Sequence, residues 1–172
     1  KHWSKINDFD KNAGDIKYVW EPSRFSWALE IVRLDKNEGT NHSEFIFNRM
    51  DSWIESKPIN LVPNYKCSQE MSLRIWNWAI LLDFYANSAS LSALRLKVYR
   101  ESISGHLDHI FKNISFSRIA VRNNHAITET GVLFLSRWLF PYILNAEKWS
   151  KQAENWFYEE LEYQIYPDGT FL

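Results

Sequence analysis

Helical periodicity, interrupted by proline, glycine and asparagine, is the feature that most constrains how this chain of 172 residues can fold. Apolar residues recur three and four positions apart through most of the sequence, and no segment shows the sustained alternation of a strand. Between the breaks the pattern predicts six helices. They cover about residues 21–37, 42–57, 68–85, 88–113, 123–140 and 146–166, with a turn at 12–15 and a loop over 115–123.

Helices joined by short connections predict an all-α fold built from antiparallel helical hairpins. Aromatic residues make up 16% of the chain and include nine Trp, so a large core with bulky side chains is expected. Some of these rings could instead line a groove, because a flat aromatic face can stack on the C–H face of a sugar. Aromatic-rich hairpins of similar length suit an α/α toroid or solenoid, whose inner helices converge on a central cleft.

Length and composition fit a single domain. A chain of 172 residues with 45% hydrophobic residues can bury a core without disulfides or metals. The net charge of −1 gives no basic footprint for nucleic acid, and no apolar run reaches the roughly 18 residues that span a bilayer. The lone Cys67 is interpreted as structural. We therefore expect one helical domain over residues 1–172, with no cofactor, no metal, no nucleic-acid partner and no membrane span.

The strongest candidate for chemistry is the run Arg122-Asn123-Asn124-His125, which precedes Glu129 at the start of a predicted helix. One interpretation is structural, because Asn is a preferred N-cap and residues four apart on a helix can pair. The other is functional, because a helix N-terminus with spare N–H groups, an amide and an imidazole suits a carboxylate or a developing oxyanion. The pattern leaves both interpretations open.

β-Elimination from a uronic acid needs groups of this kind. The proton that is removed lies α to the carboxyl group, and it becomes more acidic when an amide neutralises the carboxylate. A His or Tyr then takes the proton. Asn124 and His125 are therefore the candidate catalytic residues, and Asn123 is a candidate substrate-binding residue.

A second polar group lies on the predicted helix over residues 68–85, and a third lies at Glu21-Pro22-Ser23-Arg24, where a buried arginine–carboxylate network is the simpler account. The second group is either a solvated Glu–Arg pair or the polar stripe of an inner helix that faces a substrate cleft. We expect it to share a concave side with Asn124 and His125. Its members, kept as candidate substrate-binding residues, are Glu70, Arg74, Asn77 and Trp78.

Four stretches resemble the helical domain of heparinase II/III-type polysaccharide lyases, and together they span about residues 15–169. The Asn123-Asn124-His125 run is also similar to the Asn-Asn-His motif of toroidal alginate lyases. The four stretches are residues 15–24, residues 63–70 leading to Arg74, Asn77 and Trp78, residues 123–127 with Glu129, and residues 159–164 running into Asp168-Gly169.

The resemblance implies an incomplete α/α toroid followed by a β-sandwich domain. It also implies lyase action on an acidic polysaccharide or oligosaccharide, and a periplasmic or secreted location. Asn124 matches the position that neutralises the uronate carboxylate, with His125 beside it in the cleft, whereas the residues on the inner helix could be structural.

One departure from the family pattern bears on activity. Family members usually continue after the Asp-Gly turn into a stretch with a Tyr-His pair, whose Tyr serves as general acid or base, and this chain ends at Leu172. We therefore expect a fragment of a longer lyase-like protein that shows no turnover by itself. The alternative is a non-catalytic glycan-binding or helical scaffold module.

Overall fold

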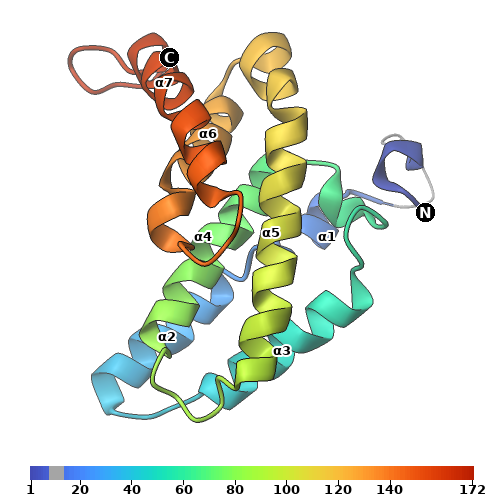
Figure 1. Ribbon diagram of the computed structural model, residues 1–172, viewed down its shortest axis with the longest axis vertical. Coiled ribbons are helices and arrows are strands. Elements are labelled where there is room, and N and C mark those ends of the chain that lie inside the picture. Colours follow the sequence, from blue (N-terminus) through green and yellow to red (C-terminus); the bar gives the residue numbers. More distant parts are fainter. Residues whose placement is uncertain (8–13) are drawn as a thin grey trace.

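The computed structural model describes residues 1–7 and 14–172, and 72% of these residues are helical (Figure 1). No strand occurs in these two ranges, although Ile165 and Phe171 form one isolated antiparallel bridge. The all-α fold class predicted from the periodicity is therefore confirmed. The turn predicted over residues 12–15 lies partly outside the described residues.

The main helices are connected by short turns, some of them 3-10 helical, and by one π-helix, η4. None of the described helices is both long and apolar enough to cross a bilayer. The α-helices are α1 (Lys17–Trp20), α2 (Trp27–Glu38), α3 (Ser43–Ser56), α4 (Ser68–Phe84), α5 (Ala93–Ser115), α6 (Asn124–Leu139) and α7 (Ala146–Gln164), and the others are η1 (Trp3–Lys5), η2 (Pro22–Arg24), η3 (Pro63–Tyr65) and η4 (Phe116–Val121).

The six helices predicted from the sequence correspond to α2–α7, and one difference lies at the start of α2. Residues 22–24 form the separate turn η2 instead of the first turn of α2. Phe25 follows with a φ of 62°, in the left-handed region, so the chain changes direction before the helix begins at Trp27. The prediction placed the helix start at Pro22, where proline is favoured in either kind of first turn.

A second difference lies after α5, where a loop was expected over residues 115–123. The chain instead continues α5 as the π-helix η4. The Arg122 amide donates a hydrogen bond to the Ser117 carbonyl at 2.7 Å, five residues back. Single π-turns of this kind occur frequently at functional sites, and this one leads directly into the N-terminus of α6.

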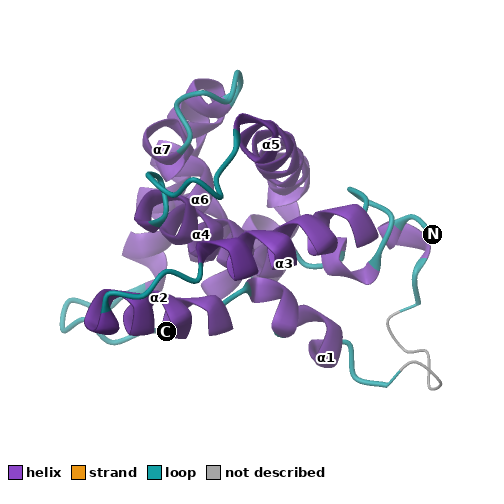
Figure 2. Cartoon of the chain, turned by 90° about the horizontal axis from the view of Figure 1, so that it is seen from below, coloured by secondary structure: helices purple, strands orange, loops and turns teal. Residues whose placement is uncertain are grey.

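Helix α4 lies in the middle of the molecule, and α5 packs against α4 and α6. Helices α6 and α7 form a closely packed hairpin on one side, and α1–α3 lie on the other side (Figures 1 and 2). Helix α4 contacts α2, α5 and α6. It can do so because buried residues occur on several of its faces, including Met71, Ile75 and Leu81. A helix that is apolar on most sides is expected at the centre of a bundle.

Aromatic rings fill the core between α3, α4 and α5. Trp53 packs edge-on against Trp78, with ring centroids 5.6 Å apart, and Phe25 packs edge-on against Trp78 at the same separation. Edge-to-face pairs of this kind add a favourable contribution beyond the burial of their surface. Much of the high aromatic content is therefore used in the core.

Candidate functional site

The N-terminus of α6 is set by a change in backbone direction after η4. Arg122 is left-handed, with a φ of 42°, and Asn123 then has extended backbone as the N-cap. The Asn123 side-chain oxygen accepts a hydrogen bond from the His125 amide at 3.0 Å. The capping interpretation of Asn123 is confirmed, because this bond satisfies one of the amides that a helix start leaves free.

Asn124 follows the cap and is exposed. Its backbone carbonyl accepts a hydrogen bond from the Thr128 hydroxyl at 2.8 Å. Its side-chain amide makes no hydrogen bond with any other described residue. An amide that is free in the first turn of a helix can donate to an incoming anion together with the backbone N–H groups beside it.

His125 is half-buried, with 30% of its side chain exposed. Its Nδ1 lies 3.8 Å from Glu129 Oε1 and 3.9 Å from Cys67 Sγ. Burial lowers the pKa of His125, although the nearby Glu70 carboxylate acts in the opposite direction. The imidazole is therefore mostly neutral at about pH 7, and a neutral imidazole can accept a proton.

Glu129 lies one helical turn beyond His125 and is almost completely buried. Its Oε2 accepts a hydrogen bond from the Ser117 hydroxyl at 2.7 Å. Burial raises the pKa of Glu129 to about 7, and the Ser117 hydroxyl only partly offsets this effect. Carboxyl groups with pKa values near neutrality are concentrated at functional sites, although buried structural groups can show the same shift.

The start of α4 lies beside the start of α6. Cys67 occupies the N-cap position of α4 and contacts His125, and the Glu70 charge acts on the same histidine. The structure thus brings together one residue from each of the two polar groups found in the sequence. Burial raises the pKa of the Cys67 thiol to about 11, so this thiol remains protonated at neutral pH.

Glu70 is held by an arginine from a distant part of the chain. Its two carboxylate oxygens accept hydrogen bonds from Arg24 Nε at 2.6 Å and Arg24 Nη2 at 2.7 Å. Only 5% of the Glu70 side chain is exposed. Two parallel charge-assisted bonds are a strong arrangement, and they match the arginine–carboxylate network that was the simpler interpretation of residues 21–24.

Arg74 is fully buried one turn further along α4. Its Nε donates to the Ser23 carbonyl at 2.6 Å, and its Nη1 lies 2.9 Å from His106 Nε2. The guanidinium carbon also lies 4.2 Å from the centroid of the Trp53 ring. These contacts occupy the arginine within the core, so its predicted contact with a substrate stays a prediction that this conformation does not favour.

Asn77 and Trp78 also serve the packing of α4. Asn77 is half-buried, and its amide donates to the Arg24 carbonyl at 2.8 Å. Trp78 has no exposed surface, and its indole N–H is buried without a hydrogen-bond partner. Their substrate-binding roles, like that of Glu70, stay predictions, and the contacts described above give all three a structural role.

The two histidines on α5, His106 and His109, also make hydrogen-bond contacts within the protein. His106 Nδ1 lies 2.6 Å from the Ser102 carbonyl, and burial lowers the pKa of His106 to about 3. His109 Nδ1 lies 2.5 Å from Asn60 Oδ1. Within residues 1–7 and 14–172, no group of three or more His, Cys, Asp or Glu residues could hold a metal ion.

Sequence reasoning missed the contact of Cys67 with His125, the bond of Ser117 to Glu129 and the pairing of Glu70 with Arg24. Cys67 is 58 positions away in the sequence, so no local pattern could reveal the contact. Ser117 lies in the segment that was predicted to be a loop. Glu70 was found as a candidate, but its partner Arg24 was assigned to a different group. An i, i+4 spacing was the one local signal, and it identified Glu129.

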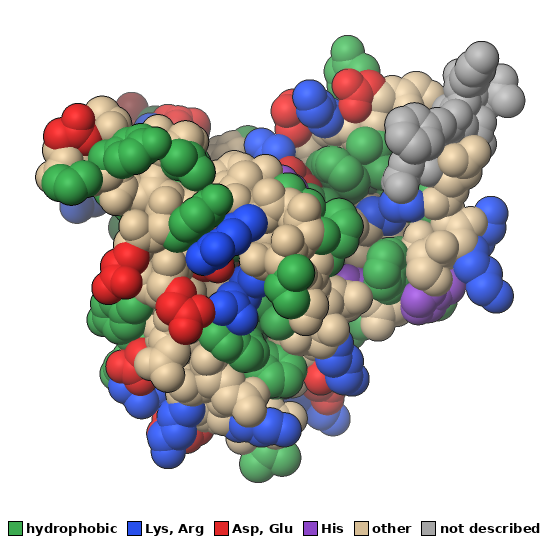
Figure 3. Space-filling view, turned by 90° about the horizontal axis from the view of Figure 1, so that it is seen from above, with side chains coloured by type: hydrophobic (Ala, Val, Ile, Leu, Met, Phe, Trp, Pro, Cys, Tyr) green, Lys and Arg blue, Asp and Glu red, His purple; other side chains and the backbone are tan. Residues whose placement is uncertain are grey.

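An arginine and an aromatic ring border the start of α6. The Arg122 guanidinium carbon lies 3.8 Å from the centroid of the Tyr163 ring, and its Nε lies 3.4 Å from a Glu160 oxygen. Arg118 pairs with Glu159 at 2.6 Å. On the upper face, Lys and Arg side chains are interspersed with Asp and Glu side chains (Figure 3). The surroundings of the site are therefore mixed in charge, with Arg122 next to the cap.

Comparison with known families identifies the class of protein. The sequence model described as "Heparinase II/III N-terminus" matches residues 6–172, which is nearly the whole chain. The chain belongs to this family, and it is thereby related to polysaccharide lyases. No curated protein and no solved structure matches it.

Proposed function

We propose that the chain is the helical part of a polysaccharide lyase, and that the start of α6 binds a uronate of an acidic polysaccharide. The observation that carries the proposal is the free side-chain amide of Asn124, which is exposed in the first turn of α6 beside the partly exposed His125. The family membership supports a polysaccharide as the substrate class. The helices would then form part of an incomplete α/α toroid.

Each residue at the start of α6 has a defined part in this proposal. The Asn124 amide donates to the uronate carboxylate and thereby increases the acidity of the proton on the adjacent carbon. His125, neutral at about pH 7, accepts that proton. Asn123 positions both residues by capping the helix. Protonation of the departing oxygen needs a separate acid, which the residues at the start of α6 do not supply.

Arg122 also favours an acidic ligand, because it places a positive charge next to the cap. This charge is shared with Glu160, so it steers an anion weakly, and the direct contact is left to Asn124. The neutral amide has no competing partner within the described residues. Specific recognition of a carboxylate by an amide and backbone N–H groups needs no full positive charge.

The alternative is a helical scaffold without catalysis. The observation in its favour is that Glu70, Arg74 and Trp78 are buried and are held by core contacts. Under this alternative, Asn124 is only the first residue of a helix. The two functions predict different effects on ligand binding when the Asn124 side-chain amide is removed and α6 is kept.

Binding of a uronate oligosaccharide by the chain tests the proposal. We expect trigalacturonate to shift the NMR signals of the Asn124 side-chain amide and the His125 backbone amide in a saturable way. Asn124→Ala should weaken this binding by about tenfold, which is the scale for one hydrogen bond to a charged group. Asn37→Ala, which removes an exposed amide on α2, is the matched control and should change nothing. Equal binding by both variants would favour the scaffold.

A further inference from the structure

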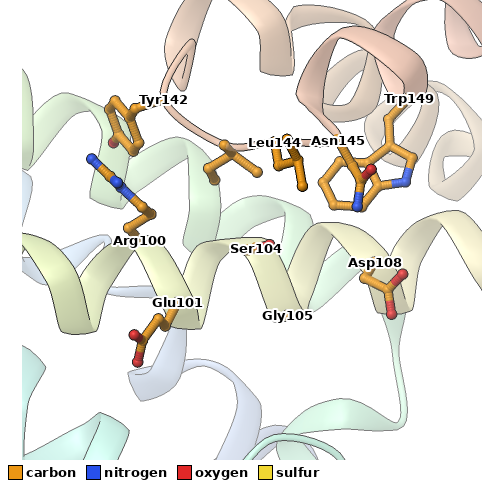
Figure 4. Close-up of a pocket in the computed structure, with 10 residues that line it drawn as sticks. Arg100, Glu101, Ser104, Gly105, Asp108, Tyr142, Leu144, Asn145 and Trp149 are labelled. Atoms are coloured by element: carbon orange, nitrogen blue, oxygen red, sulfur yellow. The ribbon is translucent and has the colours of Figure 1, made fainter.

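A pocket lies at the opposite end of α6 from Asn124 and His125. It has a volume of about 570 Å³ and is formed between α5 and the connection from α6 to α7 (Figure 4). Helix α6 has 16 residues, so its two ends are about 24 Å apart at 1.5 Å per residue. The pocket is therefore separate from the site at Asn124 and His125.

The connection between α6 and α7 is held in a defined shape. Phe140 and Ile143 are buried and anchor it to the core. The Ile143 amide donates to the Phe140 carbonyl at 3.0 Å, and the Ala146 amide donates to the Ile143 carbonyl at 3.0 Å. The residues between the anchors are turned outwards, with Tyr142 42% exposed. A pocket wall on such a connection is pre-formed, which lowers the entropy cost of binding.

The Asn145 side chain is available for ligand contact, because it does not cap the helix that it precedes. It occupies the N-cap position of α7, where an asparagine side chain ordinarily accepts a hydrogen bond from the helix. Its side chain makes no such bond. Figure 4 shows this side chain next to Trp149, among the residues that line the pocket. An amide that is left free at a cap is available for a ligand.

The other lining groups combine an aromatic ring with both signs of charge. The Arg100 guanidinium carbon lies 4.9 Å from the centroid of the Tyr142 ring. Glu101 makes no ion pair with any described residue, whereas Asp108 pairs with Lys112 at 2.6 Å. Trp149 lines the pocket, and its indole N–H makes no hydrogen bond with any other described residue. Donors and acceptors are thus both available next to an aromatic ring.

We propose that this pocket binds a neutral sugar ring. A sugar hydroxyl both donates and accepts, so it can pair with the Arg100 guanidinium and with the Asn145 amide, which face each other across the pocket from Tyr142 to Trp149 (Figure 4), while the apolar face of the ring packs on Tyr142. A volume of about 570 Å³ lies within the range for small-ligand pockets. Arg100 and Glu101, together with Asp108 and its partner Lys112, carry two positive and two negative charges, so the pocket has no excess positive charge to attract a uronate, in contrast to the start of α6 with Arg122.

NMR titration of the chain with two neutral trisaccharides, chitotriose and maltotriose, tests this proposal. We expect at least one of them to shift the Asn145 side-chain amide and the Trp149 indole signals in a saturable way. Trigalacturonate should leave these two signals unchanged at the same concentration. The readout does not involve Asn124 or His125, so it is independent of the function proposed for α6.

Two variants and a control complete the test. Asn145→Ala and Tyr142→Ala should each weaken neutral-sugar binding by about tenfold, the scale for one ligand contact. Tyr18→Ala removes a tyrosine that is 83% exposed on α1 and should leave binding unchanged. Circular dichroism checks that each variant is folded. The proposal is overturned if neither neutral sugar shifts the two signals, if trigalacturonate shifts them more, or if folded Asn145→Ala and Tyr142→Ala bind as the unaltered chain does.

Discussion

The starts of α4 and α6 lie side by side and carry similar residue types, but their polar groups are used differently. At α4, Glu70 is buried and both of its carboxylate oxygens are bound by Arg24. At α6, Asn124 is exposed and its amide has no partner among the described residues. A polar residue in a core helix thus becomes structural when distant segments supply its partners. It remains available for a ligand when only a cap is needed.

Among the variants that test this comparison, Arg74→Ala is expected to cause the largest loss of stability. The substitution removes a fully buried side chain, leaves a cavity, and deprives the Ser23 carbonyl and His106 of their partner. We expect a loss of about 3–5 kcal/mol in the free energy of unfolding, as for other large-to-small core changes. Urea denaturation measures it. Arg33→Ala, at an arginine that is 71% exposed, is the control, and a similar loss there would show that Arg74 is not special.

Glu70→Gln should produce the next largest effect. The substitution keeps the size of the side chain but removes the negative charge that accepts two hydrogen bonds from Arg24. A loss of about 2–3 kcal/mol in the free energy of unfolding is therefore expected. Glu30→Gln alters a pair between Arg33 and Glu30 that is exposed on both sides, and no measurable change is expected there. If both variants unfold at the same urea concentration as the unaltered chain, Glu70 is free for another role.

The pH dependence of stability tests the environment of His125. Burial raises the pKa of Glu129 to about 7 in the folded chain, compared with about 4.3 in an unfolded chain. The folded state therefore binds more protons between these values, and the stability contributed by Glu129 is present below about pH 4.3 and is lost as the pH rises through about 7.

Glu129→Gln removes this dependence. The difference in unfolding free energy between the unaltered chain and the variant should shift by on the order of 2 kcal/mol from pH 5 to pH 8, to the disadvantage of the unaltered chain. Thermal or urea unfolding at the two pH values measures it, and other titrating groups cancel in the difference. A pH-independent difference would mean that Glu129 is ionised in the folded chain at both values.

The smallest effect is expected from the cap itself. Asn123→Ala removes the bond to the His125 amide and should cost about 1 kcal/mol of stability. Asn123→Ser should recover most of this loss, because serine caps helices about as well. Asn124→Ala should leave stability unchanged, since its side chain has no described partner. A larger loss for Asn124→Ala than for Asn123→Ala would contradict the division of roles between the two asparagines.

The helices could be predicted from the sequence because their signals are local. Periodicity and the breaks at Gly39 and Pro58 located α2–α7, although α2 begins six residues later and α5 five residues later than predicted. The π-helix η4 was missed, because its single turn depends on Ser117 contacting Glu129 and on Arg118 pairing with α7. The turn η2 was missed because the left-handed Phe25 has no sequence signal of the kind that a glycine would give.

The candidate site was predictable only in part. The Asn123 cap and the spacing of His125 and Glu129 are local, and both were found. The burial of polar residues on α4 was not predictable, because it depends on partners that are distant in the sequence. The partners of Arg74 are Ser23 and His106, which lie 51 and 32 positions away. A stripe of polar residues on a helix has the same pattern whether it faces a cleft or a core that contains polar partners.

The most direct test of the account is the turnover of the proposed polysaccharide lyase, with and without the Asn124 side chain. Formation of the unsaturated uronate product, followed by its ultraviolet absorbance, reports elimination. We predict that Asn124→Ala lowers kcat by about 10²–10³, the scale for losing one donor that stabilises a developing oxyanion, while the unfolding free energy stays the same and Asn37→Ala keeps full activity. An unchanged kcat for Asn124→Ala would contradict the central claim and leave this asparagine as no more than the first residue of α6.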